Sequence, residues 1–437
     1  MKGGVIGDDT IFALASGAGQ GAIAVMRMSG AGSGGVLDAL CRKRPAARRA
    51  ALRTLRGPSG AALDRALVLW MPGPASYTGE DTAELFLHGG RAVAEGVAGA
   101  LTDLGARPAE AGEFTRRAVR NGRLALTEAE AVVDLVEAET AAQRDQALRQ
   151  LDGELGRIYD GWAARLRVLL AQAEALIDFA DEDLPPDEEL IASAELRALR
   201  EEIAAHLNDG RRGERLREGL MFAVTGAPNV GKSSLVNALA GRDVAIVSAL
   251  PGTTRDTLET RVIFGGVPVT LVDTAGLRET DDQVEAEGVR RARARAARAD
   301  LVIRVVAEDC DHDLGCGDPP GGAILVSSKA DLGGMAPSGS IQVSAVDGQG
   351  LECLRAELDA AALALTRRAG PPALTRARHR AALEEALERL NAAERAPLPE
   401  LRAEDLRLAM RAIGRVTGQV GVEDVLDTIF SRFCIGK

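Results

Sequence analysis

The sequence predicts a multi-domain protein with an α+β domain first, an all-α helical domain made of two separate segments, and an α/β domain inserted between them. Three observations predict this fold class. At 437 residues the chain is too long for one ordinary hydrophobic core. Short buried-strand runs alternate with helical segments only from residue 217 to about 365. Helical periodicity flanks that stretch on both sides, and a compact domain whose ends lie close together can be inserted into another.

The N-terminal α+β domain is expected over residues 1–120. Apolar runs such as "AIAVMRMSG", "RALVLWMPGP" and "TAELFLHGG" have the length of strands and are separated by Gly and Pro. One segment, "RAVAEGVAGALTDLG", has apolar residues at helical spacing. This mixture is typical of an α+β domain.

The helical domain is expected over residues 121–216 and 366–437. The first segment contains a capping box, Thr-x-x-Glu, at Thr127, and the apolar periodicity that follows is helical, without strand-like alternation. After the inserted domain, "ALTRARHRAALEEALERLNAAE" repeats this pattern. Both segments therefore belong to one helical domain in this interpretation.

The inserted domain is expected over residues 217–365. Its apolar runs include "LMFAVTG", "VPVTLVDTAG", "DLVIRVVA", "AILVSSKAD" and "IQVSA". Buried strands that alternate with helices are typical of a mainly parallel sheet with helices on both faces.

Charge and hydropathy limit the location and partners of the chain. The formal net charge of −11 argues against a surface devoted to phosphate backbones, which leaves local basic stretches such as "CRKRPAARRAALRTLR". The start, "MKGGVIGDDT", lacks the apolar core of a signal peptide, and no apolar stretch reaches the length of a membrane span. We therefore expect a cytoplasmic protein that does not bind a membrane.

The five cysteines predict neither a disulfide framework nor a metal centre. Their number is odd and their spacing irregular, as expected of reduced thiols in a cytosol. The stretch "CDHDLGC" invites a metal interpretation, but it lacks paired CxxC spacing, so an acidic, Gly-rich loop is the favoured alternative.

The stretch "GAPNVGKSS" follows a predicted strand and precedes a predicted helix. It fits the phosphate-loop pattern G-x-x-x-x-G-K-[ST] through Gly226, Gly231, Lys232 and Ser233. Glycine lets backbone N–H groups face a phosphate, Lys232 reaches its outer oxygens, and Ser233 supplies a hydroxyl to Mg²⁺. An ordinary strand-to-helix turn is the alternative.

Further phosphate-facing elements follow in the order that a nucleotide site requires. "VDTAG" ends the next strand, so it brings the Asp273 carboxylate near Mg²⁺ and the Gly276 N–H near a γ-phosphate. Between the two elements, "PGTTRD" offers Thr254 as a second hydroxyl for Mg²⁺.

Two later loops predict that the base is guanine. "SSKAD" is similar to the Asn-Lys-x-Asp motif of translation-factor-type GTPases, with Ser328 where Asn is usual, and "VSA" is similar to their companion loop. The carboxylate of Asp331 can accept the two N–H hydrogens that guanine presents and adenine lacks. The expected nucleotide is GTP, held in a loop that Ser328 orders less than Asn would.

The residues around the phosphate loop suggest how charge is offset during hydrolysis. Leu277 stands where Ras-like enzymes have a glutamine, so water cannot be oriented in that way. The side-chain carbonyl of Asn229, with backbone carbonyls of "SALPGTT", can hold a monovalent cation in place of an arginine finger. The alternative is that Asn229 is only a turn residue.

The complete arrangement resembles the MnmE (TrmE) family of tRNA modification GTPases over nearly the whole chain. The residues that carry the resemblance are "DTIFALASGAGQGAIAVMRMSG", "YTGEDTAELFLHGG", "GEFTRRAVRNGRLALTEAEAVVDLVEAET", the nucleotide motifs and the terminal "FCIGK". The resemblance implies a folate-binding N-terminal domain that forms a homodimer, a discontinuous helical domain and an inserted P-loop GTPase domain.

The resemblance also implies a reaction and its partners. With the FAD-containing protein MnmG, in a heterotetramer, the family modifies C5 of the wobble uridine of certain tRNAs with an aminomethyl or carboxymethylaminomethyl group. The one-carbon unit comes from 5-formyl-tetrahydrofolate or a related folate. GTP hydrolysis, which requires Mg²⁺ and is activated by K⁺ and by the meeting of two GTPase domains, drives the conformational cycle.

Site residues follow from matching the family's motifs position by position. The ligands implied for K⁺ are Asn229, Ser248, Leu250 and Thr253, and those for Mg²⁺ are Ser233 and Thr254. Glu285 matches the acid that positions water, Arg255 a switch-loop arginine, and Cys434 would lie near the folate pocket in a catalytic or positioning role. Without the resemblance, Glu285 would be taken for a solvated residue at a helix start and Cys434 for a core thiol. The full set expected at the nucleotide is Asn229, Val230, Gly231, Lys232, Ser233, Ser234, Ser248, Ala249, Leu250, Pro251, Gly252, Thr253, Thr254, Asp273, Thr274, Ala275, Gly276, Ser328, Lys329, Ala330, Asp331, Ser344, Ala345 and Val346.

The folate pocket is implied at Arg27, Glu84, Arg123 and Lys437. Glu84 can accept hydrogen bonds from the pterin N–H groups, while the cations meet carboxylates. Arg123 stands where Lys is common, which keeps the charge and alters its geometry. The turn "SGAGQG" departs from the usual Pro-Pro-Gly-Arg-Gly.

Two other classes of protein were weighed. A GTP-switched ribosome-assembly factor usually carries a basic RNA-binding module, which the acidic chain lacks. A regulatory GTP-binding scaffold without turnover would agree with Leu277 and Ser328, but Glu285 and Thr254 argue against it. GTPase rates in KCl and in NaCl distinguish these classes.

Overall fold

The computed structural model describes most of the chain and divides it into two compact units. The described residues are 9–17, 19–178, 186–227, 229–242, 259–273, 299–307, 322–333, 336–366, 373–418 and 436. One unit comprises residues 1–133, 150–164 and 410–437, and the other comprises residues 134–149 and 165–409. The domain limits predicted at residues 120, 216 and 365 stay predictions.

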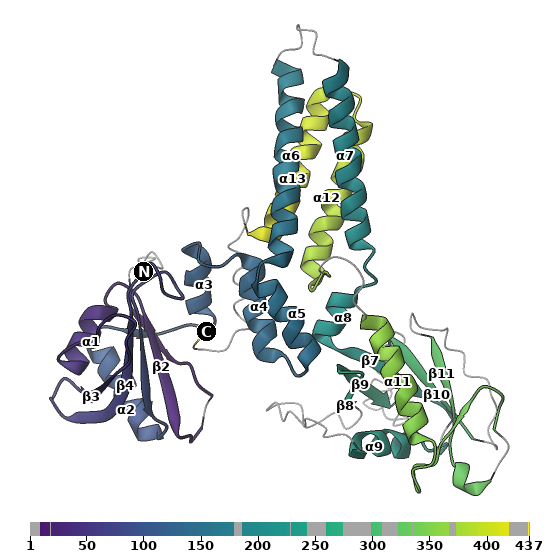
Figure 1. Cartoon of the computed structure of the whole chain (residues 1–437), viewed down its shortest axis with the longest axis horizontal. Coiled ribbons are helices and arrows are strands. Elements are labelled where there is room, and N and C mark those ends of the chain that lie inside the picture. The colour runs from purple at the N-terminus through teal and green to yellow at the C-terminus, as the bar shows by residue number, and fades with distance from the viewer. Residues whose placement is uncertain are drawn as a thin grey trace, which may run out of the picture. The chain divides into compact units, whose positions relative to one another are not determined.

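The first unit contains a mostly antiparallel sheet of six strands in the order β3-β4-β5-β2-β1-β6, in which only β1 and β6 pair in parallel. Strands β2, β3 and β4 of this sheet are labelled in Figure 1. The strands are β1 (Ile11–Leu14), β2 (Ile23–Ser29), β3 (Ala51–Arg56), β4 (Ala62–Met71), β5 (Thr82–His88) and β6 (Arg107–Pro108). Side chains alternate along a strand, so Met26 and Met28 of β2 are buried in the core while Ile23 is exposed. Helices α1 (Ser33–Cys41) and α2 (Arg91–Asp103) pack on this sheet. The predicted α+β character of this region is confirmed.

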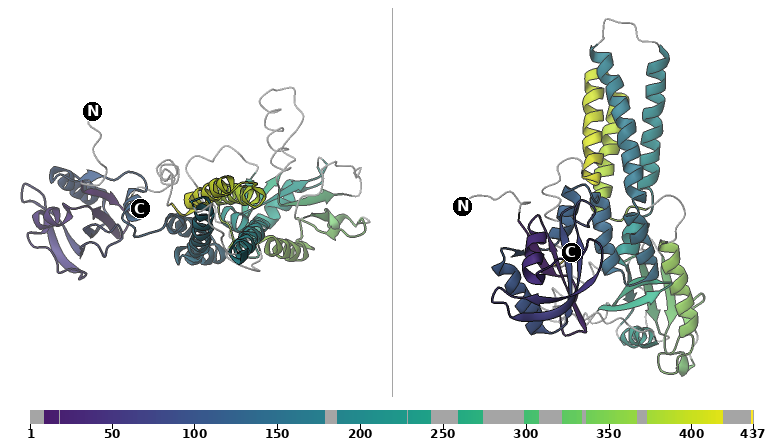
Figure 2. Two further views of the ribbon diagram at one scale, coloured as in Figure 1. Left: turned by 90° about the horizontal axis from the view of Figure 1, so that it is seen from above. Right: turned by 60° about the vertical axis from the view of Figure 1, so that its left-hand side comes forward.

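Helices account for the described sequence assigned to the helical domain, and one further helix, α3, ends at the last residue of the range assigned to the α+β domain. They are α3 (Glu113–Arg120), α4 (Leu126–Glu137), α5 (Ala141–Leu151), α6 (Glu154–Asp178), α7 (Pro186–Leu207), α8 (Arg212–Glu218), α12 (Ala377–Arg395) and α13 (Pro399–Thr417). Of these, α6, α7, α12 and α13 run side by side (Figures 1 and 2). Helices α7 and α12 pack together, with Leu199 and Ile203 of α7 and Leu383 and Leu390 of α12 buried at helical spacing. None of the helices in the described part of the chain is long and apolar enough to cross a membrane.

The second unit contains a six-stranded sheet in the order β12-β11-β10-β7-β9-β8. Its strands are β7 (Leu220–Thr225), β8 (Glu259–Phe264), β9 (Val267–Asp273), β10 (Leu301–Val306), β11 (Ala323–Ser327) and β12 (Ile341–Gln342). All neighbours are parallel except β8 and β9, which confirms the predicted mainly parallel sheet. Helices α9 (Lys232–Arg242) and α11 (Leu351–Thr366) pack on β8 and β9, and Phe222 stacks on Phe264 in the core. A short 3-10 helix, η2 (Ala330–Leu332), follows β11.

Candidate functional site

The phosphate loop connects β7 to α9 and has a backbone that only certain residues can adopt. Gly226 has φ +154°, and a Cβ added there would lie 2.2 Å from the carbonyl oxygen of Val305 on the neighbouring strand. Gly231 has φ +97°, and Asn229 lies in the left-handed region with φ +61°. Glycine is therefore required at position 226 by contact and at position 231 by conformation, and Asn is among the few other residues that tolerate φ above zero.

Lys232 begins α9 with its side chain directed back into the loop. The residue is 3% exposed, and its ammonium group donates a hydrogen bond to the Gly226 carbonyl at 2.7 Å and another to the Ala227 carbonyl. A cation is thus held beside the first turn of a helix, whose N–H groups also favour an anion. This is the geometry of a phosphate site.

Ser233 and Asp273 meet although they are 40 positions apart in sequence. The Ser233 hydroxyl donates a hydrogen bond to Oδ2 of Asp273 at 2.6 Å, and Asp273 is buried at the end of β9. Hydroxyl and carboxylate oxygens are the hard ligands that Mg²⁺ prefers, either directly or through its water molecules. The donor set of this pair therefore fits Mg²⁺.

Ser328 joins the proposed base-reading loop to the phosphate loop. Its hydroxyl is placed to bond the carbonyl oxygens of Val230, in the phosphate loop, and of Val306, at 3.2 Å. Sequence reasoning had assigned Ser328 only a weaker ordering role and missed this contact. The order of the strands could have indicated this contact. The loop after β11, which begins with Ser328, and the loop after β7 leave the same edge of a parallel sheet, so the two loops lie close together.

The two loops expected at the base are close because β11 and β12 are parallel neighbours. The N–H of Ala330 donates a hydrogen bond to the Val343 carbonyl at 3.1 Å, next to Ser344. The Ser344 hydroxyl accepts hydrogen bonds from the N–H groups of Val346 and Asp347, at 3.3 and 3.4 Å. Asp331 lies exposed in η2, where its carboxylate is accessible to a ligand.

Several predicted nucleotide-site and C-terminal residues lie outside the described residues. They are Ser248, Ala249, Leu250, Pro251, Gly252, Thr253, Thr254, Arg255, Thr274, Ala275, Gly276, Leu277, Glu285, Cys434 and Lys437. The "CDHDLGC" stretch also lies there. Within the described residues, no group of three or more His, Cys, Asp or Glu side chains could hold a metal ion.

A second candidate site lies on the sheet of the first unit, where Arg27 and Glu84 are opposite each other on β2 and β5. The Arg27 Nε donates a hydrogen bond to Glu84 Oε1 at 2.9 Å, and one terminal nitrogen lies 2.8 Å from the same oxygen. The Arg27 guanidinium carbon lies 5.5 Å from the ring centroid of Tyr77 and 5.9 Å from that of Phe114. Burial raises the pKa of Tyr77 and outweighs its hydrogen bond with Thr115. The result is a half-buried charged pair beside two aromatic rings. Tyr77 is half-buried and could stack on a flat ligand, whereas Phe114 is fully buried beneath the pair.

The other two residues expected at the folate differ in how the structure places them. The side-chain stem of Arg123 lies against Gly79, in the "YTGED" motif, and Arg123 makes no hydrogen bond to Arg27 or Glu84 in the described part of the chain. Lys437 is outside the described residues, but Gly436 lies against the end of β1, where an added Cβ would be 2.4 Å from the Leu14 carbonyl oxygen.

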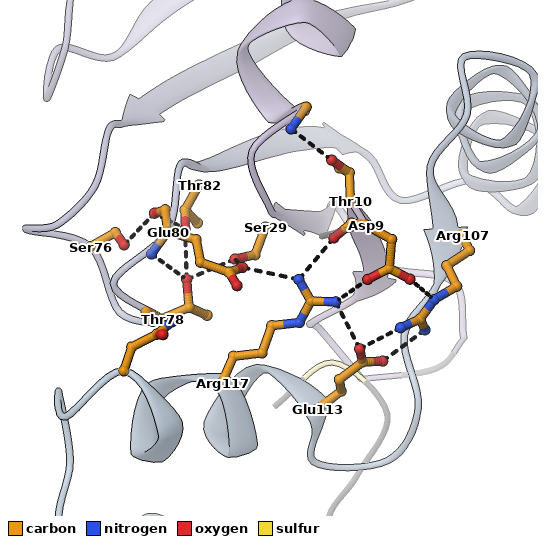
Figure 3. A network of polar contacts seen from close by, with 12 residues as sticks. Asp9, Thr10, Ser29, Ser76, Thr78, Glu80, Thr82, Arg107, Glu113 and Arg117 are labelled. Carbon is orange, nitrogen blue, oxygen red and sulfur yellow. Dashed lines mark hydrogen bonds and ion pairs between the residues drawn. The ribbon is translucent and has the colours of Figure 1, made fainter. Parts of the chain in front are cut away.

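An ionic network in the same unit has Arg117 and Glu113 at its buried centre and Asp9 and Arg107 at its half-exposed edge (Figure 3). Arg117 of α3 is 3% exposed and contacts Glu113 at 2.9 Å, Asp9 at 2.7 Å and Glu80 at 3.0 Å. Arg107 also bonds Glu113, at 2.6 and 2.9 Å. Burial alone would raise the pKa of Glu113, but hydrogen bonds from Arg107, the Glu110 N–H and Arg117 outweigh it, so that the pKa is lowered. Glu113 is therefore held ionised.

In the motifs "YTGED" and "GEFT", one residue lies beside Arg27 and its neighbour in sequence belongs to the ionic network of Arg117. Tyr77 faces Arg27, while the next residue, Thr78, shares a 2.7 Å hydrogen bond with Ser29 in the network. Likewise Phe114 faces Arg27, while Glu113 bonds Arg117. Sequence reasoning missed Tyr77 and Phe114 as pocket residues, although both stand inside the motifs "YTGED" and "GEFT".

Two family models match the sequence. The model described as the MnmE helical domain matches residues 126–434, and the model described as the GTP-binding protein TrmE N-terminus matches residues 10–123. A protein of Gluconacetobacter diazotrophicus named tRNA modification GTPase MnmE is 61% identical over 433 residues, which are 98% of this chain and 98% of the relative. Proteins of the same name from Granulibacter bethesdensis and Rhodospirillum rubrum are 56% and 54% identical, and each match covers 98% of this chain and 99% of the relative.

Proposed function

This chain belongs to the MnmE family of tRNA modification GTPases, and from that membership we propose that it hydrolyses GTP to drive modification of tRNA at C5 of the wobble uridine. The observation that carries the proposal is the phosphate loop, in which the buried Lys232 ammonium lies at the start of α9 and Ser233 bonds Asp273. These groups are those that P-loop nucleotide hydrolases use to hold phosphates and Mg²⁺. When bound, Mg²⁺ would neutralise charge on the phosphate oxygens, held by Ser233 and by Thr254.

Guanine selectivity is proposed to come from Asp331, with Lys329 beside it and Ser344 to Val346 as the companion loop. The exposed carboxylate of Asp331 can accept both N–H hydrogens of guanine at once. Ser328 holds this loop to the phosphate loop through its bond to the Val230 carbonyl. In this proposal the loop that binds the base and the loop that binds the phosphates are connected by a hydrogen bond.

Asn229 is proposed to hold K⁺, with Ser248, Leu250 and Thr253 as further ligands. The left-handed backbone of Asn229 is explained by turn chemistry alone. Its side chain, however, is exposed and bonds none of the residues that the structure describes, so the amide oxygen is accessible to a cation beside the phosphates. K⁺ would supply the positive charge that an arginine finger supplies elsewhere. Glu285 is proposed to position the attacking water, with Arg255 in the same switch region.

The Arg27–Glu84 pair is proposed to bind a folate such as 5-formyl-tetrahydrofolate. Glu84 would accept hydrogen bonds from the pterin, the half-buried Tyr77 ring would lie beside it, and the cations of Arg123 and Lys437 would meet the folate carboxylates. When bound, the folate would supply the one-carbon unit for the wobble uridine, with Cys434 proposed near the folate and the FAD protein MnmG as partner. Homodimerisation through the first domain is part of this proposal.

GTP turnover in KCl and in NaCl is the experiment that tests the proposed GTPase. We expect fast turnover in KCl, slow turnover in NaCl, and loss of the potassium effect in Asn229→Ala. Equal rates in the two salts would contradict potassium activation, and absence of turnover would favour a regulatory GTP-binding scaffold. Mass spectrometry of wobble uridines from cells lacking the protein tests the tRNA role, because unchanged nucleosides would remove it and favour a ribosome-assembly GTPase.

A further inference from the structure

Residues 33–72 of the first unit concentrate positive charge in a chain that is acidic overall. They contain two carboxylates, Asp38 and Asp64, against eight cations, a net +6 where the whole chain has −11. The cations are Arg42, Lys43, Arg44, Arg48, Arg49, Arg53, Arg56 and Arg65. We call these eight residues the β3 rim.

The β3 rim follows one edge of the sheet, because hydrogen bonds fix the loop between α1 and β3 along that edge; the register of β3 and β4 places Arg53 on the face of buried Leu55 and Arg65 on the opposite face. The Arg53 Nε donates a hydrogen bond to the Lys43 carbonyl at 3.0 Å, and the Arg48 N–H donates to the Trp70 carbonyl at 2.7 Å. The Arg44 guanidinium lies 5.2 Å from the centre of the Trp70 ring. Strand β3 is the outermost strand of its sheet, with α1 packed beside it (Figure 1).

Most residues of the β3 rim are exposed to solvent, and all but one make no ion pair in the described part of the chain. Six of the eight residues are exposed, and the exceptions, Arg53 and Arg56, are half-buried. Within the described part of the chain, only Arg44 makes an ion pair, with the exposed Asp38 at 3.1 Å. Crowded like charges weaken a compact fold by self-repulsion. A partner of high negative charge density would remove that repulsion.

We propose that the β3 rim binds the phosphate backbone of the RNA substrate. This proposal rests on the proposed function, which supplies a polyanionic substrate. Seven of the eight cations are arginine, whose planar guanidinium matches two phosphate oxygens at once. Backbone contacts of this kind carry no sequence information, so they orient different tRNAs equally. The rim therefore positions the RNA, and selection of the uridine is left to another part of the protein.

The proposal is tested by binding of a fluorescein-labelled tRNA transcript to the full-length protein across a series of KCl concentrations. The variant Lys43→Gln/Arg49→Gln/Arg65→Gln removes three exposed charges without removing a hydrogen bond that their side chains make. We expect its affinity at low salt to fall roughly tenfold or more, and the slope of log affinity against log salt to become shallower by about two to three, since each lost phosphate contact removes about 0.7 to 0.9. The variant Arg49→Lys/Arg65→Lys keeps both charges and should keep the slope.

A matched control removes three exposed arginines from helices. Arg149→Gln/Arg167→Gln/Arg411→Gln has the same change in net charge, and none of the three side chains makes an ion pair in the described structure. The control should bind the tRNA within about twofold of the unaltered protein.

Three results would overturn the proposal. The first is an unchanged slope of log affinity against log salt in the triple variant of the rim. The second is an equal loss of tRNA affinity in the control variant. The third is that the rim variant loses binding to phosphatidylserine vesicles but keeps its binding of RNA. The last would assign the rim to an anionic lipid surface. GTP turnover of the unaltered protein without RNA tests the proposed function separately, so either idea can fail alone.

Discussion

The phosphate loop and the Arg27 pocket hold their charged groups by different means. In the loop, backbone does most of the positioning, because carbonyls of Gly226 and Ala227 hold the Lys232 ammonium. In the first unit, side chains hold each other, and the Arg117–Asp9 contact joins residues 108 positions apart. A backbone site needs few residues and tolerates changes around it, whereas a buried ionic network fails when one member is removed. Mutations in the phosphate loop should therefore affect activity, and mutations in the ionic network of the first unit should affect stability.

Removing Arg117 should give the largest effect on stability. Arg117→Ala would leave the half-buried Glu80 without its cation and the buried Glu113 with Arg107 as its remaining ion-pair partner. Loss of one member of a buried ionic group costs about 3–5 kcal/mol in similar cases. We expect the calorimetric transition of the first unit to move to lower temperature while GTP turnover stays within about twofold. Arg120→Ala, on the same helix but exposed, should change stability by at most about 0.5 kcal/mol. Equal effects of the two substitutions would mean that the network does not stabilise the unit.

Removing Lys232 should have the opposite profile. Lys232→Ala takes away the phosphate-facing cation, so we expect the rate of GTP hydrolysis to fall by about 100-fold or more, or ~2.7 kcal/mol in transition-state stabilisation. The unfolding of the first unit should be unaffected, because the network lies in different residues. Phosphate release under saturating GTP, together with calorimetry, measures both. A variant that keeps its turnover would contradict the assigned role of Lys232.

Acid should weaken the network before it affects the backbone-built loop. The lowered pKa of Glu113, against an ordinary value of 4.5, means that the unfolded chain binds the proton more readily. Stability from this group is therefore present above pH 4.5 and is lost as the pH falls through the lower pKa of the folded state. Glu113→Gln should flatten the dependence of the unfolding temperature of the first unit on pH below 4.5. An unchanged pH profile in Glu113→Gln would show that another group titrates there.

The same contrast explains how far the sequence could predict the structure. The phosphate loop occupies nine consecutive residues, and its glycines and lysine are required locally, so the motif alone predicts the strand, the turn and the helix. The Arg27–Glu84 pair depends on the register of β2 and β5, which a single sequence does not determine, and it was inferred only from family resemblance. The aromatic flank of Tyr77 and Phe114 was missed for the same reason. The pattern of apolar residues was enough to distinguish the α+β, helical and mainly parallel regions, because a periodicity of 2 residues in strands and of 3.6 in helices is a local property of the sequence.

Ser328 tests the difference between positioning by backbone and positioning by side chains, because its side chain bonds the backbone of another loop. We expect this effect to be the smallest. Ser328→Ala removes the bond to the Val230 carbonyl, which should weaken GTP binding by about 1 kcal/mol, or roughly fivefold. Ser328→Thr keeps the hydroxyl and serves as the matched control, with an expected affinity close to that of the unaltered protein. Titration with a fluorescent GDP analogue measures the affinity, and competition by ATP shows whether selectivity for guanine falls as well. If the alanine variant binds as tightly as the threonine variant, the parallel strands alone position the two loops. The nucleotide site would then be positioned by backbone even at Ser328, as it is at Lys232.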